Sequence, residues 1–410
     1  MSERFVVDGL AGARTLRGTI AVGGAKNAVL KILPATVLFE DEFPIENVPD
    51  IEDVGRMREL LDALKAQPTV LRQDIAERFR ASIVLTGPVL ARYGAVEFPF
   101  PGGCVLGERS IDLFLAGFRT MGAEVEEEES YFKIRSNGPL RGAHITFPLI
   151  SVTGTETLMM AAVLAEGETV LKNAAMEPEI GYLADFLNSC GARIEGAGTP
   201  SIRIQGGSLL RAEGKAFTVP PDRIETGSLA ILAALTGEDV TITSCDPAWA
   251  EVPLGLLRQA GVQMEVEADS IRITKSDAPY KMVSVRTHEY PGFPTDLQAP
   301  MAVFMSQCEG EGSILETIFD GRFRYVDDLV IMGADLSVMN PHRVLARGPR
   351  KLTRKNLQSP DLRGGLAYLV AAAVAEGTSM IDNAYLIDRG YAHIEERLQK
   401  LGLSIKREKI

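Results

Sequence analysis

Apolar segments of helical period recur along the chain, and each ends in a glycine followed by a short alternating run. The glycine stands at five equivalent points, namely Gly122, Gly191, Gly261, Gly333 and Gly402. Successive gaps between these glycines are 69, 70, 72 and 69 residues. A glycine just past an amphipathic helix is a common helix terminator, and alternation of apolar and polar positions is typical of a half-buried strand. The pattern therefore predicts a structural repeat of about 70 residues.

A second sequence pattern recurs at the same spacing of about 70 residues. The segments "AAVLAEGETVLKNA", "ILAALTGEDVTITSC" and "VAAAVAEGTSMIDNA" each indicate an apolar helix, a glycine turn and a β-branched strand. Six units of the order βαβαββ would nearly fill the 410 residues. The first unit is short, because "LLDALKAQPTVLRQDIAERFRAS" leaves no room for a strand hairpin. We predict an α/β protein with two domains of three units each and a ligand cleft between the domains.

Charge and composition narrow the choice of partners. The chain has a net charge of −12 and no Lys/Arg run, which argues against a nucleic-acid partner, so an anionic ligand would need a local basic pocket. Four dispersed cysteines without a CxxC pair, and four histidines without paired spacing, support neither a disulfide framework nor a metal centre. The sequence shows neither an apolar run of membrane-spanning length nor a signal-peptide core. We therefore expect a cytoplasmic protein that does not contact membranes.

One cysteine stands in the segment "FPFPGGCVLGERS", residues 98–110. The prolines and glycines around Cys104 predict a surface loop, whereas a free cysteine is more often a buried packing residue. Arg109 is close enough in sequence to favour the thiolate form. No histidine is adjacent to serve as a base, so a proton donor is easier to justify than a nucleophile. A functional thiol and a structural cysteine both remain open from this segment alone.

The segment "GGAKNAVLKIL", residues 23–33, runs two glycines into Lys26 and Asn27 at the start of an apolar helix. Backbone N–H groups at a helix N-terminus, together with a lysine, favour a bound phosphate. Neither the Walker A pattern nor the dinucleotide fingerprint is met. An ordinary glycine turn with an exposed lysine is therefore the alternative.

Further candidate residues stand at expected helix starts. Asp296 in "YPGFPTDLQAP" precedes an apolar helix, where an aspartate is usually an N-cap but can also point into a cleft. Arg322, Arg363 and Arg389 stand at turns that we expect to start helices. Each alone would more often form a surface salt bridge. Recurrence at matching points of separate units favours a shared anion site, because guanidinium groups suit phosphate and carboxylate.

Seven motifs together resemble the UDP-N-acetylglucosamine 1-carboxyvinyltransferases, a family of enolpyruvyl transferases. The motifs are "GGAKNAVLKIL", "PGGCVLGERSIDL", "PDRIETG", "FPTDLQA", "GRF", "DLRGG" and "IDRGY", in the family's order from about residue 5 to about residue 405. The resemblance implies a two-domain inside-out α/β barrel, the enolpyruvyl transferase fold. It places residues 1–25 and 221–410 in a discontinuous catalytic domain. Residues 26–220 would form a second domain with a mobile cysteine loop at about 99–110.

The resemblance also implies a reaction. The enolpyruvyl group of phosphoenolpyruvate would pass to the 3-hydroxyl of UDP-N-acetylglucosamine with release of phosphate, in the first committed step of peptidoglycan synthesis. The enzyme would serve cell wall biogenesis, cell shape and cell division, and fosfomycin would target it. These two substrates are the expected partners. No cofactor and no metal ion are implied, and we expect a monomer.

By motif position, the resemblance assigns roles to nine residues. Three would be catalytic: Cys104 as a proton donor, Lys26 on the phosphate of phosphoenolpyruvate, and Asp296 as the base beside the sugar hydroxyl. Six would bind substrate, with Asn27 and Arg80 on the sugar nucleotide, Arg109 and Arg389 on phosphoenolpyruvate, and Arg322 and Arg363 as further arginines of the pocket.

The chain departs from the family pattern at several positions. Lys31 and Ser110 stand where proline is expected, Phe114 where histidine is expected, and Leu149 with Ile150 where a lysine is frequent. Ser110, Phe114 and Leu149 fall where the uridine nucleotide would bind, so the acceptor stays open. An enolpyruvyl transferase for another nucleotide or phosphorylated acceptor and a non-catalytic binding relative are the alternatives. The shikimate-pathway enzyme is disfavoured, because it typically has Lys-Ser in place of Lys26-Asn27 and lacks the cysteine loop.

Overall fold

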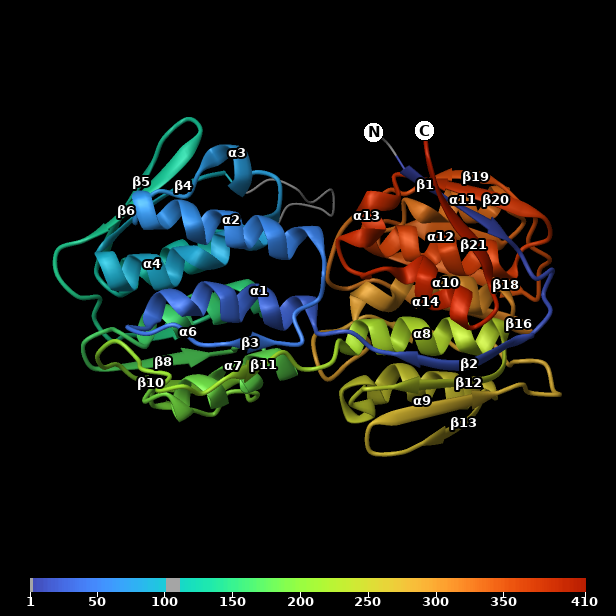
Figure 1. Ribbon diagram of the computed structural model, residues 1–410, viewed down its shortest axis with the longest axis horizontal. Coiled ribbons are helices and arrows are strands. Elements are labelled where there is room, and N and C mark those ends of the chain that lie inside the picture. Colours follow the sequence, from blue (N-terminus) through green and yellow to red (C-terminus); the bar gives the residue numbers. More distant parts are fainter. Residues whose placement is uncertain (1–2, 101–110) are drawn as a thin grey trace. The chain divides into compact units, whose positions relative to one another are not determined.

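The structure is a computed structural model that describes residues 3–100 and 111–410. These residues form two compact units. Unit 1 comprises residues 3–23 and 221–410, and unit 2 comprises residues 24–100 and 111–220. The chain therefore leaves unit 1 after Gly23 and returns to it after Pro220, as the sequence colours of Figure 1 show.

Three helices form the interior of unit 1. They are α8 (Arg223–Thr236), α10 (Gln298–Ser306) and α12 (Leu362–Val374). Every residue of α8 and α10 is buried, and so is every residue of α12 after Leu362. The three helices pack against one another (Figure 1). Largely apolar helices that are buried on all sides need a complete covering, which the rest of unit 1 supplies.

Three four-stranded sheets and a set of outer helices cover these inner helices. In each sheet a leading strand runs parallel to the strand that follows an inner helix, and antiparallel strands complete the sheet. The first sheet has the order β2 (Leu16–Ala21), β12 (Gly237–Thr243), β14 (Ser270–Thr274) and β13 (Gln263–Val266). The second has the order β15 (Val285–Arg286), β16 (Gly310–Leu315), β18 (Arg343–Gly348) and β17 (Asp335–Asn340). The third has the order β19 (Asn356–Gln358), β20 (Thr378–Asp382), β1 (Glu3–Asp8) and β21 (Ser404–Lys409). The outer helices are α9 (Glu251–Ala260), α11 (Tyr325–Ile331), α13 (Ala384–Asp388) and α14 (Ile394–Lys400), with the 3-10 turns η3 (Pro247–Ala250) and η4 (Thr295–Leu297).

The first two strands of the chain complete sheets whose other strands come from the C-terminal half. In β1, Phe5 stands opposite Ile381 of β20 and Arg407 of β21. The crossing that follows β2 is also fixed to unit 1, because the Gly23 N–H donates to Oε2 of Glu225 at 2.6 Å. Unit 1 is therefore built from two separate stretches of chain.

Unit 2 repeats the arrangement around α1 (Lys26–Ala35), α4 (Thr86–Tyr93) and α6 (Val152–Ala162). Its outer helices are α2 (Glu52–Ala66), α3 (Gln73–Ala76), α5 (Asp112–Thr120) and α7 (Pro178–Ser189), with the 3-10 turns η1 (Thr36–Leu38) and η2 (Arg80–Leu85). One sheet has four strands, in the order β7 (His144–Thr146), β8 (Glu168–Lys172), β10 (Ser201–Gln205) and β9 (Ile194–Glu195). A second has three, in the order β4 (Ala95–Pro99), β6 (Tyr131–Ser136) and β5 (Ala123–Glu127). The third has only β11 (Phe217–Thr218) and β3 (Ile45–Glu46), so the first repeat lacks the hairpin that other repeats carry.

The five glycines that mark the repeat all adopt positive φ directly after an outer helix. Their φ values are 92° at Gly122, 107° at Gly191, 101° at Gly261, 113° at Gly333 and 100° at Gly402. Residues with a Cβ rarely adopt this left-handed conformation, whereas glycine does so without steric cost. The sequence periodicity therefore reflects a repeated helix end.

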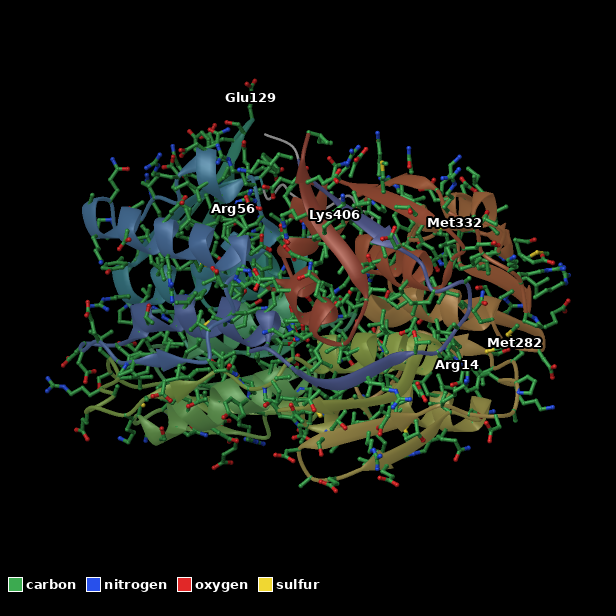
Figure 2. The ribbon with its side chains drawn as sticks, turned by 45° about the vertical axis from the view of Figure 1, so that its right-hand side comes forward. Arg14, Arg56, Glu129, Met282, Met332 and Lys406 are labelled. Carbon is green, nitrogen blue, oxygen red and sulfur yellow. The ribbon has the colours of Figure 1, made fainter. Side chains whose placement is uncertain are left out.

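Most charged side chains lie on the outside of the two units, and a smaller set is buried. Figure 2 shows Glu129 pointing away at the tip of the hairpin between β5 and β6, next to three further acidic residues in sequence. Across residues 3–100 and 111–410, no helix combines the length and the apolar character that a membrane span needs.

Candidate active site

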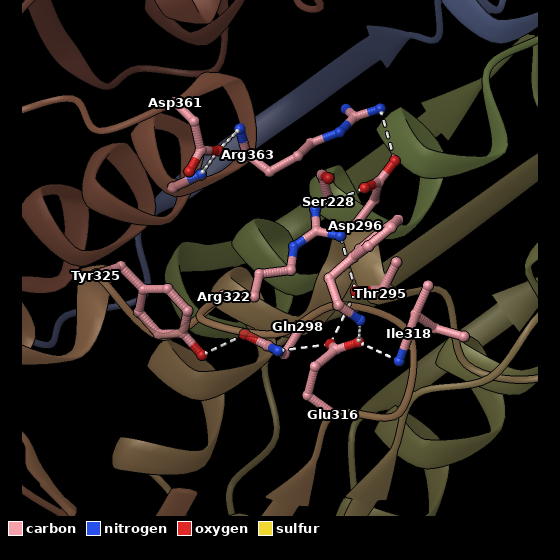
Figure 3. A network of polar contacts seen from close by, with 12 residues as sticks. Ser228, Thr295, Asp296, Gln298, Glu316, Ile318, Arg322, Tyr325, Asp361 and Arg363 are labelled. Carbon is pink, nitrogen blue, oxygen red and sulfur yellow. Dashed lines mark hydrogen bonds and ion pairs between the residues drawn. The ribbon is translucent and has the colours of Figure 1, made fainter. Parts of the chain in front are cut away.

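Asp296 lies against two arginines in unit 1. It belongs to η4, a 3-10 turn that runs directly into α10. Its Oδ1 accepts a hydrogen bond from Nη2 of Arg322 at 2.7 Å, and its Oδ2 lies 3.4 Å from Nη2 of Arg363 (Figure 3). The two arginine side chains are 5% and 6% exposed, whereas that of Asp296 is 28% exposed. The guanidinium groups thus compensate the charge of the carboxylate from the protein side, and the carboxylate is the part that solvent reaches.

The neighbouring inner helices use their aspartates differently. Asp222 caps α8 by accepting from the N–H groups of Ile224 and Glu225, and Asp361 caps α12 by accepting from those of Arg363 and Gly364. The start of α10 has no such side-chain cap. The sequence allowed Asp296 to be either an N-cap or a carboxylate with another role. Because no side chain caps α10, the structure favours the second of these.

A buried tyrosine fixes the other end of Arg363. Nη1 of Arg363 donates to the Tyr391 hydroxyl at 2.7 Å, and this hydroxyl lies 3.1 Å from Oγ of Ser228 in α8. Burial raises the pKa of Tyr391, although the nearby Arg363 opposes the effect, so the phenol stays neutral. Arg363 is therefore held between Tyr391 and Asp296 while it stands in the first turn of α12.

The three arginines of the sequence motifs do not all start helices. Arg322 lies in the turn before α11, and Arg363 lies in the first turn of α12. Arg389 is the residue that ends α13, so the expectation of a helix start is wrong for it. Its neighbour Asp388 forms two hydrogen bonds of 2.7 Å with Arg407 of β21, which fix this turn. The contacts described here join Arg322 and Arg363 through Asp296.

Lys26 and Asn27 begin α1 in unit 2 and are half-buried, whereas the residues from Ala28 onward are buried. Nζ of Lys26 lies 2.7 Å from Oδ2 of Asp53, a buried carboxylate in the first turn of α2. The preceding glycine has a packing reason, since a Cβ on Gly24 would lie 1.9 Å from the carbonyl oxygen of Asn47. The Asp53 carboxylate thus holds the ammonium group of Lys26, and Gly24 allows the backbone before α1 to pass close to that of Asn47.

Some of the other residues that the sequence singled out between residues 80 and 149 are described by the structure, and some are not. Arg80 is half-buried and begins η2. Cys104, Arg109 and Ser110 lie outside the described residues. Phe114, expected near a nucleotide, is 3% exposed in α5 and packs its ring edge-on against Phe118. Leu149, in contrast, is 72% exposed.

The other three cysteines are buried thiols. Burial raises the pKa of Cys245 to about 11 and that of Cys308 to about 12, and Cys190 packs in unit 2. A thiol that holds its proton near neutral pH is a poor nucleophile. Within the described part of the chain, no group of three or more His, Cys, Asp or Glu side chains is placed to hold a metal ion.

Sequence reasoning missed the residues that hold the candidates in place. Asp53 in α2 and Glu316 after β16 stand in segments with no motif of their own, whereas Tyr391 ends the motif "IDRGY" without having been assigned a role. Tyr391 had the clearest available signal, because it follows "DRG" in a motif that was already singled out.

Comparison with known proteins decides the family. The family model of EPSP synthase (3-phosphoshikimate 1-carboxyvinyltransferase) matches residues 10–398. The chain belongs to the EPSP synthase family. Within this family it is 42% identical to a protein of Aeromonas salmonicida named UDP-N-acetylglucosamine 1-carboxyvinyltransferase, over 99% of this chain and 100% of the relative. A protein of the same name from Magnetococcus marinus is 43% identical over 97% of this chain and 98% of the relative.

Solved structures of enolpyruvyl transferases confirm the fold. The enolpyruvyl transferase NikO from Streptomyces tendae matches with a TM-score of 0.88 and 21% identity, over 100% of this chain and 99% of that chain. EPSP synthase from Acinetobacter baumannii matches with a TM-score of 0.73 and 17% identity, over the whole of both chains. The enolpyruvyl transferase fold that the sequence motifs implied is therefore correct.

Proposed function

We propose that this protein transfers the enolpyruvyl group of phosphoenolpyruvate to the 3-hydroxyl of UDP-N-acetylglucosamine and releases phosphate. The observation that carries the proposal is the match at 42% identity, over 99% of the chain, to a relative named for this activity. The same activity would place the protein in the cytoplasm, at the first committed step of peptidoglycan synthesis, and hence in cell wall biogenesis.

The reaction needs an acid, a base and cationic groups. C3 of phosphoenolpyruvate takes a proton, the sugar hydroxyl oxygen bonds to C2, and a tetrahedral phospho-ketal results. C3 then loses a proton, the bond from C2 to the phosphate oxygen breaks, and the enolpyruvyl ether and inorganic phosphate remain. We assign the acid to Cys104 and the base that takes the hydroxyl proton to Asp296.

The contacts of Asp296 support its assignment. A base at this step must be ionised and reachable by the substrate, and Asp296 combines partial exposure with two buried arginine partners. We assign Arg322 and Arg363 to the anionic pocket, and Lys26, Arg109 and Arg389 to phosphoenolpyruvate. Asn27 and Arg80 would contact the sugar nucleotide. The pairing of Lys26 with Asp53 supports its role, because it holds the ammonium group at the first residue of α1.

These assignments divide the reaction between the two units. The proposed base and three arginines belong to unit 1, and the proposed lysine and asparagine belong to unit 2. The proposed acid, Cys104, lies outside the described residues. We therefore treat unit 1 as the catalytic domain and unit 2 as the domain that carries the cysteine segment. A variant in either unit should then stop the same reaction.

Phosphate release from phosphoenolpyruvate tests the proposal directly. The release is measured separately with UDP-N-acetylglucosamine, UMP and shikimate 3-phosphate as acceptors. Release only with UDP-N-acetylglucosamine supports the proposal and makes Phe114 and Leu149 compatible with it. Release only with another acceptor would replace the substrate but keep the chemistry, and no release with any acceptor would favour a non-catalytic binding relative.

A further inference from the structure

We propose that Glu316 is a positioning residue for Arg322 and Asp296, acting through the hydroxyl group of Thr295. The inference rests on the proposed function, because it gives a role to a residue that we do not assign to the substrates and whose hydrogen bonds go to Thr295, Gln298 and the backbone of the following turn. It extends that function by naming Glu316 as the group that decides which atoms donate and which accept in the hydrogen bonds beside Asp296.

Glu316 is fully buried where β16 ends, and each of its oxygens has its own set of donors. Oε1 accepts from the backbone N–H groups of Ile318 at 2.8 Å and Phe319 at 3.0 Å. Oε2 accepts from Oγ1 of Thr295 at 2.8 Å and Nε2 of Gln298 at 2.7 Å (Figure 3). All four contacts use donors, a pattern that a carboxylate satisfies completely. One oxygen thus holds the local turn, and the other points to the segment that carries Asp296.

The hydroxyl of Thr295 transmits this arrangement to Arg322. A threonine hydroxyl has a single hydrogen, and Thr295 gives it to Glu316. Its oxygen is then free only to accept, and Nη1 of Arg322 donates to it at 2.7 Å. Nη2 of the same guanidinium donates to Asp296 at 2.7 Å. Two adjacent residues of η4, Thr295 and Asp296, therefore hold Arg322. Because Glu316 takes the hydroxyl hydrogen of Thr295, the Thr295 oxygen can accept from Arg322.

A second arm of the network fixes the start of α10. The hydroxyl of Tyr325 in α11 donates to Oε1 of Gln298 at 2.8 Å, which leaves Nε2 of that amide facing Glu316. Burial raises the pKa of Tyr325, and the nearby Glu316 adds to the effect, so the phenol keeps the proton that it donates. Gln298 therefore has a single satisfied orientation between a fixed donor and a fixed acceptor. The network joins the turn before α11 to the turn before α10.

The substitution Glu316→Gln replaces the acceptor oxygen that faces Thr295 and Gln298 with a donor NH2 group, with almost no change in side-chain shape. Its amide oxygen can still accept from Ile318 and Phe319, so the local turn is kept. Its amide NH2 then faces the hydroxyl of Thr295 and the amide NH2 of Gln298, which are both donors in the present structure. Thr295 must rotate its hydrogen away or lose a partner, and Arg322 loses one of its two anchors.

We expect Glu316→Gln to lower kcat by roughly 10- to 100-fold, the range that an unsatisfied buried polar group produces. Thr295→Val, which removes the hydroxyl in a side chain of similar shape, should lower kcat to a similar extent. The double variant should lose little more than either single variant, because both interrupt the same chain of hydrogen bonds. Thr295→Ser should restore most of the turnover that Thr295→Val loses. The matched control is Glu311→Gln, the same change at an exposed position of β16 that pairs with Arg347.

Two readouts separate positioning from a merely structural role. In the pH profile of kcat, the limb on the acid side should move to higher pH in Glu316→Gln. The reason is that a displaced Arg322 no longer favours the ionised form of Asp296. Thermal unfolding should show whether Glu316→Gln remains folded like Glu311→Gln. An unchanged acid limb together with unchanged kcat would overturn the proposal, and so would additive losses in the double variant.

A crystal structure of the Glu316→Gln protein gives an answer that does not depend on turnover. The expected result is a displaced Arg322 guanidinium that no longer contacts both Thr295 and Asp296. An Arg322 that keeps both contacts would overturn the positioning role, whatever the acceptor of the enzyme is. If the unaltered protein releases no phosphate, the proposed function fails, and this structure still decides whether Glu316 positions Arg322.

Discussion

Lys31 of α1 and Glu156 of α6 form an ion pair in the interior of unit 2, with Nζ and Oε2 2.6 Å apart. Lys31 is 7% exposed and Glu156 is 1% exposed. Glu179 and Glu177 add negative charge around Glu156. A buried charge is tolerated only while its partner is present. The lysine that stands where we expected proline is thus matched by an acid on another inner helix.

Breaking this pair from one side should destabilise the protein. We expect Lys31→Met or Glu156→Met alone to lower the free energy of unfolding by about 3–5 kcal/mol, because each leaves an uncompensated buried charge. The double variant should be more stable than either single variant, since two apolar side chains replace both charges. Urea unfolding at pH 8 measures all four proteins. Losses that simply add in the double variant would mean that the two residues are not coupled.

Stability should also depend on pH through Glu156. Burial raises the pKa of Glu156 to about 7 from its ordinary 4.5, with Lys31 opposing the shift and Glu179 and Glu177 adding to it. Between these two values the folded protein keeps a proton that the unfolded chain releases. The contribution of Glu156 therefore favours folding less as pH rises from about 4.5 to about 7, and it is constant above that range. At about 1.4 kcal/mol per pKa unit, the change is at most about 3.5 kcal/mol.

Unfolding measured from pH 5 to pH 8 in Glu156→Gln and in the unaltered protein isolates this contribution. The unaltered protein should lose stability relative to the variant as the pH rises. Parallel profiles would show that Glu156 has the same proton affinity in the folded and unfolded states.

Asp53 should matter for substrate affinity through Lys26. Asp53→Asn keeps the shape of the side chain but removes the charge that faces the ammonium group 2.7 Å away. We expect KM for phosphoenolpyruvate to rise roughly 10- to 100-fold, the range for a hydrogen bond to a charged group. Glu52→Gln, an exposed change at the neighbouring position of α2, is the control. An unchanged KM in Asp53→Asn would separate Asp53 from phosphate binding.

Cys104 should be needed for turnover but not for folding. Cys104→Ala is expected to lower kcat by roughly 100- to 10,000-fold, the range for losing a general acid. Cys104→Asp keeps a group that can donate a proton, and we expect it to retain activity. Steady-state phosphate release distinguishes the two variants. Full activity of the alanine variant would remove the cysteine from the mechanism, and an inactive aspartate variant would point to a nucleophile.

Asp296 should be needed for turnover but not for binding of phosphoenolpyruvate. Asp296→Asn retains an oxygen that can accept from Arg322 but cannot take the proton of the sugar hydroxyl. A loss in kcat of roughly 100- to 10,000-fold is expected, with phosphoenolpyruvate binding in calorimetry within about threefold of the unaltered protein. Normal turnover in this variant would exclude Asp296 as the base.

The repeat could be predicted because it depends on local chemistry. A helix that must end in a left-handed residue selects glycine, and Gly122 and Gly261 therefore mark the same point of different units. The shortness of the first repeat was also visible, since too few residues separate α2 from η2 for a hairpin. Local signals of this kind do not depend on where the rest of the chain folds.

The contacts around the site could not be predicted, because they join residues that are distant in sequence. Nothing near Thr295 indicates that Glu316 receives its hydrogen bond, and nothing near Lys26 points to Asp53. Arg389 shows the opposite error, where a motif suggested a helix start and the structure places a helix end. One signal was available, since a lone lysine in "AVLKILPA" and a lone glutamate in "GTETLMMAA" each need a partner inside an apolar helix.

The position of β1 between β20 and β21 has a consequence for biosynthesis. Asp8 and its hydrogen-bond partner Thr378 are 370 residues apart in the chain. At about 5–20 residues per second, a ribosome needs tens of seconds to synthesise that interval. Unit 2 is continuous and is finished first, so it folds while two strands of unit 1 wait without neighbours. Until the rest of unit 1 is synthesised, β1 and β2 lack the strands that pair with them, and unpaired strand edges favour aggregation in a nascent chain.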